Sequence, residues 1–129
     1  MHSNAELVRK GYAAFNTGDL LTLTELFTET ASWHTPGRSP LAGDSVGRDA
    51  IFAQFGRYLE WTGGTFQAEL RYVTADDEGR VVAIHHNSGQ RDVRQLDVDC
   101  CLTFRIENGQ VVEGREHFYD LYAWDEFWA

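Results

Sequence analysis

The sequence predicts one α+β domain, in which a curved antiparallel sheet packs against three N-terminal helices and leaves an enclosed pocket. Two observations lead to this prediction. Apolar residues recur at helical spacing in the first half of the chain, whereas the second half alternates between apolar and polar residues as strands do. Helices followed by strands with short turns are typical of α+β domains. The length of 129 residues fits a single domain spanning residues 1–129.

The first half of the chain contains most of the expected helices. A first helix is expected from Asn4, a suitable N-cap, to the turn at Gly18, which is a favourable residue just beyond a helix end. Asp19 then caps a second helix that begins at Leu20. The remaining elements of this half are a short strand over 30–35, a loop over 36–43 that holds both prolines, and a helix over 48–61.

Strands are expected after residue 64, where period-two alternation begins. The Asn108-Gly109 pair favours a tight hairpin turn, because both of its residues tolerate positive φ. The expected strands cover 65–75, 80–91, 95–106 and 110–119, and a short amphipathic helix follows over 121–128.

Charge and composition exclude several classes of partner. Eleven Lys and Arg residues among twenty Asp and Glu give a net charge of −9, so neither nucleic acid nor an anionic membrane is an expected partner. No run of apolar residues is long enough for a membrane helix, and no secretion signal is recognised, so we expect a cytoplasmic protein. Cys100 and Cys101 point to opposite faces of one strand and are expected to be free thiols. His85 and His86 also diverge, and no converging ligand set predicts a metal site.

Several segments carry a family resemblance. They are 12–19, at the end of the first helix; 26–34, where the second helix runs into a strand; 36–43 and 47–51, around the proline loop; 108–113, in the last hairpin; and 125–128. In this order they resemble the NTF2-like superfamily, in its SnoaL-like and ketosteroid-isomerase branch. The resemblance implies a cone-shaped fold around a small-molecule pocket and a homodimer formed through the outer sheet face.

The resemblance does not fix one activity, because this fold hosts enzymes of several kinds as well as non-enzymes. The three catalytic positions of the ketosteroid isomerases fall on Gly11, Thr35 and either Cys100 or Cys101, so none of their Tyr and Asp residues is kept. A steroid-isomerase mechanism that uses those three residues is therefore not expected. The SnoaL-like cyclases are the better match, and they imply acid/base chemistry without metal or cofactor.

Four ionisable residues are candidates for acid/base catalysis. His34 ends the first strand beside the proline loop, and the pKa of a histidine lies near working pH. His117 and Asp120 are three residues apart, so Asp120 could orient the imidazole, although it is also a good N-cap for the following helix. Glu116 lies on the opposite face of the last strand from His117. The sequence leaves open which face lines the pocket.

Aromatic residues from several elements are expected to wall the pocket: Tyr12, Phe15, Trp33, Phe55, Phe118 and Trp124. The predicted function is thus a cofactor-independent acid/base enzyme, polyketide-cyclase-like or isomerase-like, acting on a small, partly apolar carbonyl compound. The alternative is a small-molecule-binding protein without catalysis. A lesser alternative is an epoxide hydrolase that uses Arg94, Asp97 and Asp99.

Overall fold

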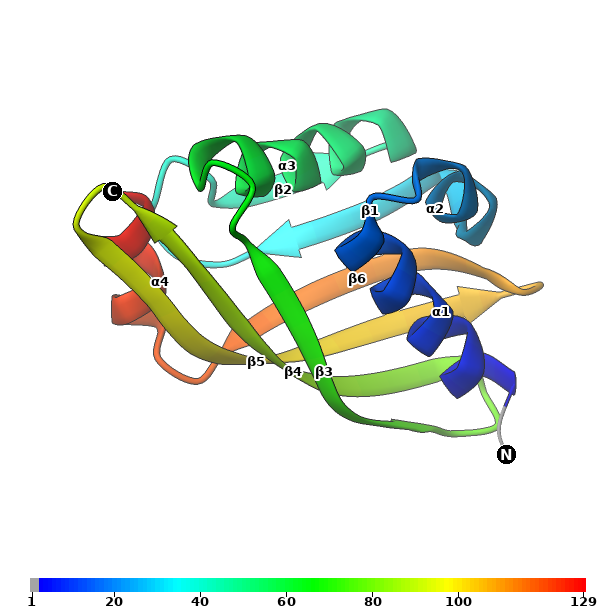
Figure 1. The fold of residues 1–129 in the computed structure, drawn as a ribbon. Helices are drawn as coiled ribbons and strands as arrows, with labels where there is room; N and C mark the ends of the chain where they lie inside the picture. Colours follow the sequence, from blue (N-terminus) through cyan, green and yellow to red (C-terminus); the bar gives the residue numbers. More distant parts are fainter. Residues whose placement is uncertain (1–2) are drawn as a thin grey trace.

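The computed structural model describes residues 3–129 and contains four helices and six strands in this range (Figure 1). The helices are α1 (Ser3–Thr17), α2 (Leu20–Leu26), α3 (Arg48–Trp61) and α4 (Leu121–Trp128). The strands are β1 (Phe27–Thr35), β2 (Gly43–Val46), β3 (Gln67–Ala75), β4 (Arg80–Arg91), β5 (Arg94–Glu107) and β6 (Gln110–Phe118). The α+β class is confirmed. The bounds of α3, β4 and α4 are those expected, and Asp19 caps α2 by accepting a hydrogen bond from the Thr22 N–H.

The strands form one sheet in the order β2-β1-β6-β5-β4-β3. The prediction of an antiparallel sheet is wrong for one pair, because β1 runs parallel to β6. No hairpin joins these two strands; the chain between them passes through α3 and four other strands, so nothing forces them to be antiparallel. Strand β2, which pairs with β1, was not expected because four largely exposed residues carry no apolar alternation.

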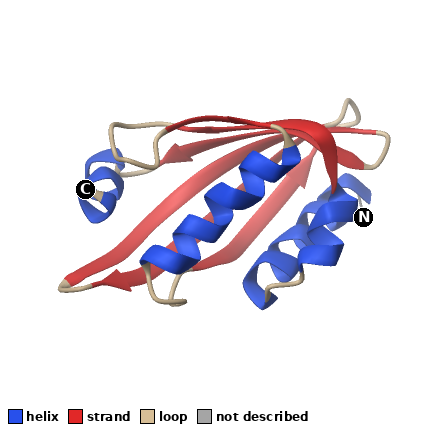
Figure 2. Cartoon of the chain, turned by 90° about the horizontal axis from the view of Figure 1, so that it is seen from above, coloured by secondary structure: helices blue, strands red, loops and turns tan. Residues whose placement is uncertain are grey.

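The sheet is curved and does not close into a barrel. Register shifts interrupt the β1–β6, β3–β4 and β5–β6 pairs, and such bulges bend the strands that carry them. Figure 2 shows the helices beneath the concave side of the sheet, with α4 at one end. Helix α1 contacts β3 and β4, and α3 contacts β1 and β2. The concave face therefore becomes the inner wall of a cone whose other wall is helical.

Alternation along β5 divides the sheet into an inner and an outer face. Leu96, Val98, Cys100 and Leu102 are buried on the inner face, while the residues between them are more exposed. Cys101 lies on the outer face, and both cysteines are free thiols, as expected. At the wide end of the sheet, Trp124 and Trp128 of α4 are completely buried against it. No helix among residues 3–129 has the length and apolar character needed to cross a bilayer.

Candidate functional site

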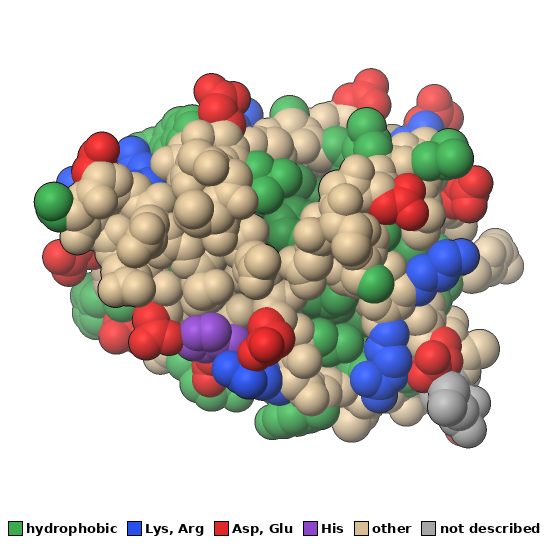
Figure 3. All heavy atoms as spheres, in the orientation of Figure 1, with side chains coloured by type: hydrophobic (Ala, Val, Ile, Leu, Met, Phe, Trp, Pro, Cys, Tyr) green, Lys and Arg blue, Asp and Glu red, His purple; other side chains and the backbone are tan. Residues whose placement is uncertain are grey.

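An apolar cavity lies between the concave sheet and helices α1, α2 and α3. Its volume, taken as the space open to the centres of water molecules, is about 70 Å³, several times what one water needs. Figure 3 shows apolar side chains at the bottom of a hollow in one face of the molecule. The wall consists of Leu7, Val8, Gly11, Tyr12, Phe15, Leu23, Leu26, Phe27, Trp33, Phe55, Tyr58, Phe66, Ala68, His85, Asn87, Leu102, Phe104, Val111 and Glu116.

Glu116 of β6 is the ionisable carboxyl group in this wall, and it is buried. One of its oxygens, Oε1, accepts three hydrogen bonds: from Trp33 Nε1 at 3.0 Å, from Thr35 Oγ1 at 2.8 Å and from the Tyr58 hydroxyl at 3.1 Å. Trp33 and Thr35 reach it from β1 because both point to the inner face of the sheet, and Tyr58 reaches it from α3. Three donors from two elements therefore fix the orientation of the carboxylate.

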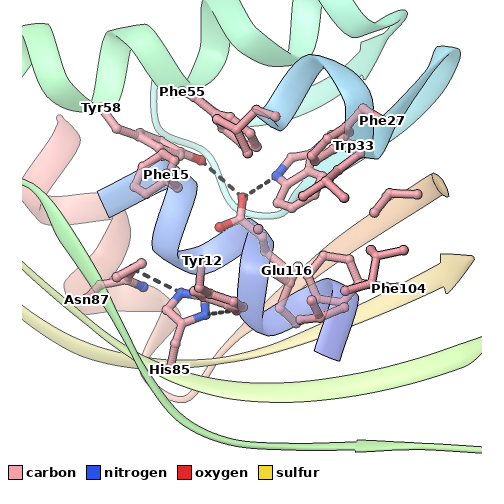
Figure 4. Close-up of a pocket in the computed structure, with 18 of the residues that line it drawn as sticks. Tyr12, Phe15, Phe27, Trp33, Phe55, Tyr58, His85, Asn87, Phe104 and Glu116 are labelled. Atoms are coloured by element: carbon pink, nitrogen blue, oxygen red, sulfur yellow. Dashed lines mark hydrogen bonds between the residues drawn. The ribbon is translucent and has the colours of Figure 1, made fainter. Parts of the chain in front are cut away.

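The second oxygen, Oε2, has no hydrogen bond to any residue of the described chain. In Figure 4 the bonds from Trp33 and Tyr58 converge on one carboxylate oxygen, while the other points away from both donors, into the cavity. Carboxylate oxygens are strong acceptors and proton carriers. Oε2 is thus held in place and remains available to a ligand.

A further layer of side chains fixes the donors themselves. Gln54 Nε2 donates to the Leu41 carbonyl at 2.7 Å and to the Tyr58 hydroxyl at 3.3 Å. Arg57 donates to Gln54 Oε1 at 2.7 Å, which determines which way the amide of Gln54 faces. The position of Tyr58 against Glu116 is therefore set by α3 and the loop after β1.

Burial raises the pKa of Glu116 above its ordinary value of 4.5. An apolar wall disfavours the charged form, and this effect exceeds the opposing effect of the three donors. A carboxyl group with a raised pKa is a stronger base than an exposed one.

The raised pKa makes a testable prediction about stability. Between the ordinary pKa and the raised one, the folded protein holds a proton that the unfolded chain has released, so the free energy of unfolding falls as pH rises through this range. Glu116→Gln has no carboxyl group to ionise, so it abolishes this decrease in the free energy of unfolding. The variant still has a side-chain oxygen for the three donors. We expect the variant and the wild type to have similar melting temperatures below pH 4.5, and the variant to be more stable at pH 8.

Thermal unfolding monitored by circular dichroism at several pH values measures this difference. The matched control is Glu60→Gln, which changes an exposed carboxylate on α3. A Glu116→Gln variant that is less stable than the wild type at pH 8 would contradict the burial of an uncompensated charge at this site.

A second polar group lies in the same wall. The Tyr12 hydroxyl is 2.5 Å from His85 Nδ1, and His85 Nε2 is 3.0 Å from Asn87 Oδ1. Burial lowers the pKa of His85 to about 4, so the ring is neutral at pH 7. Burial also raises the pKa of Tyr12 well above its ordinary value, so this hydroxyl keeps its proton. Figure 4 shows the three side chains in a row beside the cavity.

The structure brings some of the residues expected at the site together and separates others. Of the four catalytic candidates, only Glu116 lines the apolar cavity. Of the six expected wall residues, Tyr12, Phe15, Trp33 and Phe55 line it. Phe118 and Trp124 do not: their rings stack on each other with centroids 3.8 Å apart, at the end of the sheet that α4 covers.

The other three catalytic candidates lie away from the apolar cavity, and His34 and His117 line a separate polar hollow that also touches Glu116. His34 is on the outer face of β1, where its nitrogens are 2.8 Å from Asp44 Oδ1 and 3.2 Å from Glu113 Oε2. His117 is exposed on the outer face of β6. Asp120 caps α4 by accepting a hydrogen bond from the Ala123 N–H at 3.0 Å. The alternation of β6 explains this outcome, because a strand that turns Glu116 inward must turn His117 outward.

The trio that would serve an epoxide hydrolase also lies outside the cavity. Asp97 and Asp99 flank the outward-facing His86, at 2.7 Å and 2.6 Å from its two nitrogens. Arg94 donates to the backbone carbonyls of Phe127 and Ala129. No group of three or more potential ligands is placed to hold a metal ion among residues 3–129.

Sequence reasoning did not assign roles to Tyr58, His85 and Asn87. A signal was present for His85 and Asn87: they are two residues apart on β4, in phase with Val81 and Ala83, so all four share the buried face. In this chain the polar residues in phase with the apolar face of β4 line the cavity, whereas the strand-end histidines His34 and His117 do not.

Comparisons with known proteins agree with this architecture. The model of the SnoaL-like domain family matches residues 8–114. An uncharacterised protein of Mycobacterium tuberculosis is 30% identical over 127 residues, which are 98% of this chain and 97% of that protein. The structure of Bal32a, from a soil-derived mobile gene cassette, is 65% identical with a TM-score of 0.97, and the match covers 98% of this chain and 97% of that one.

Two more distant structures share the fold. An NTF2-like protein of unknown function from Burkholderia pseudomallei is 22% identical with a TM-score of 0.82, covering 100% of this chain and 99% of that one. A putative SnoaL-like polyketide cyclase from Jannaschia is 19% identical with a TM-score of 0.81, covering 98% and 91%. The expected resemblance to NTF2-like and SnoaL-like proteins is confirmed.

Proposed function

Because the chain belongs to the SnoaL-like domain family, we propose that it is a cofactor-independent acid/base enzyme that acts on a small, mostly apolar carbonyl compound. Glu116 is the base in this proposal. The single observation that carries it is the buried carboxylate whose Oε1 is held by three donors and whose Oε2 is left without a partner beside an apolar cavity.

The chemical step is the removal of a proton from the carbon next to the carbonyl group. Oε2 takes the proton, the electron pair of the C–H bond moves into a new C=C bond, and the carbonyl oxygen gains the negative charge of an enolate. Return of the proton to another carbon gives an isomer. Attack of the enolate carbon on a second carbonyl group of the same molecule gives a ring and an alkoxide, and the alkoxide takes the proton back from Glu116. The Jannaschia protein is named a putative polyketide cyclase.

The surroundings of Glu116 favour this chemistry in two ways. The apolar wall raises the pKa of the carboxyl group, which increases its strength as a base. Hydrogen bonds to Oε1 hold Oε2 in one direction, so that the group does not need to reorient during proton transfer.

Exchange of α-protons in D₂O tests the proposal with simple ketones in place of the natural substrate. A panel of small apolar ketones and 1,3-diketones is incubated with the protein, and loss of the α-proton signals is followed by ¹H NMR. We expect exchange well above the buffer rate for the members that bind. Members that bind but are recovered without deuterium would favour the alternative function, a small-molecule-binding protein without catalysis.

A further inference from the structure

We infer that Asn87 provides an oxygen-binding subsite in the cavity, where its side-chain N–H donates a hydrogen bond to the carbonyl oxygen of a neutral ligand. The inference rests on the proposed function in that the ligand occupies the same cavity. It adds a second point of attachment and a substrate class: an uncharged molecule that carries an acceptor oxygen at the end of the cavity formed by β4.

The main observation is an unpartnered amide nitrogen. Asn87 is 1% exposed, and its Nδ2 has no hydrogen bond partner. Four buried side-chain polar atoms lack a partner in the described part of the chain, on Thr28, Asn87, Trp124 and Trp128, and of these residues only Asn87 lines the cavity. A buried N–H without an acceptor is costly, and a ligand that supplies one removes this cost.

The neighbouring histidine determines which end of the amide is free. A neutral imidazole has one N–H, and Tyr12, which keeps its hydroxyl proton, donates it to His85 Nδ1. The ring proton is then on Nε2 and is donated to Asn87 Oδ1. This chain of hydrogen bonds from Tyr12 to His85 to Asn87 turns Oδ1 toward the histidine and leaves both protons of Nδ2 for another acceptor.

The rest of the wall limits the charge of the ligand. No Lys or Arg side chain lines the cavity, and its one carboxyl group is that of Glu116. An anionic ligand would lose its hydration without gaining a positive partner and would face a carboxylate. A ketone oxygen needs only a hydrogen bond donor, which Asn87 supplies.

The same subsite would serve catalysis. When Glu116 removes an α-proton, charge develops on the carbonyl oxygen, and a donor already aimed at that oxygen stabilises the enolate more than the ketone. Asn87 is on β4 and Glu116 is on β6, and both line the same cavity.

A matched pair of ligands tests the inference by binding alone. The probes are a rigid cyclic ketone, camphor, and the hydrocarbon of the same skeleton, bornane. Isothermal titration with the wild type and with Asn87→Leu, which keeps the branched shape and the number of side-chain heavy atoms, gives four dissociation constants. We expect Asn87→Leu to weaken camphor binding about tenfold relative to bornane binding, which is the net effect of one hydrogen bond.

The inference is overturned if Asn87→Leu changes the affinity for camphor and bornane by the same factor. Should that variant fail to fold, the side-chain amide signals of Asn87 in the wild-type protein provide a second reading. If the inference holds, these amide signals shift when camphor is added but not when bornane is added. Equal shifts with the two ligands contradict the inference. Glu116→Gln must retain the discrimination between the two ligands, so failure of the base and failure of the subsite are separate results.

Discussion

Glu116→Gln is expected to lower the rate of α-proton exchange by about 10²–10⁴-fold, the range typical for the loss of a positioned general base. The amide keeps an oxygen for Trp33, Thr35 and Tyr58, so the wall of the cavity should not change. What it loses is the ability to accept a proton at the position of Oε2. Dissociation constants for ligands should therefore stay within a few-fold of the wild type, while turnover falls.

Glu113→Gln is the matched control for this variant. Glu113 is on the same strand, but its carboxylate is 3.2 Å from His34 on the outer face of the sheet. We expect Glu113→Gln, His34→Ala and His117→Ala to exchange α-protons at the wild-type rate. A Glu116→Gln protein with the wild-type rate, or a His34→Ala protein without activity, would contradict the assignment of Glu116 as the base and indicate a catalytic group outside the cavity.

Gly114→Ala is expected to destabilise the fold by about 1–3 kcal/mol, the cost of overfilling a packed core, and also to reduce activity. A Cβ atom on Gly114 would overlap the six-membered ring of Trp33. Trp33 is 4% exposed and packs edge-on against Phe55 and Phe104, so its ring cannot shift without disturbing these contacts or entering the cavity that it lines. Any displacement of the ring also moves Nε1, one of the three donors to Glu116.

Gly56→Ala serves as the control for the glycine substitution. Gly56 is exposed within α3, and an added Cβ would meet no atom within 4 Å. We expect this variant to gain about 0.5–1 kcal/mol, because glycine is a poor helix residue. Chemical denaturation of both variants and the α-proton exchange assay measure the two effects. Wild-type stability and activity in Gly114→Ala would contradict the close packing of Trp33 on β6.

Local patterns in the sequence predict most of the fold. The helical spacing over 48–61 and the strand alternation over 80–91 predict α3 and β4 with their observed bounds. The parallel β1–β6 pair and the short strand β2 could not be predicted in the same way. Their pairing depends on contacts between distant segments, and local propensity carries no information about such contacts.

The site was harder to predict than the fold, for a related reason. Strand alternation separates Glu116 from His117 but does not say which of the two faces inward. The choice is made by tertiary packing, because β6 lies between β1 and β5 with its apolar residues on the concave side. Phe118 and Trp124 are aromatic residues next to the predicted catalytic segment, which is why they were expected in the wall of the cavity. In the structure they stack on each other at the end of the sheet that α4 covers.

The most direct test of the role of Glu116 is to compare its titration with the pH dependence of catalysis. The carboxyl ¹³C shift of Glu116, assigned by its loss in Glu116→Gln, gives the protonation midpoint of the free protein. The value of kcat/KM for α-proton exchange is measured over the same pH range. We predict that kcat/KM rises with pH through that midpoint, and that the midpoint lies above 4.5, because burial raises the pKa. A midpoint at or below 4.5, or a rate that does not change across it, would contradict Glu116 as the base.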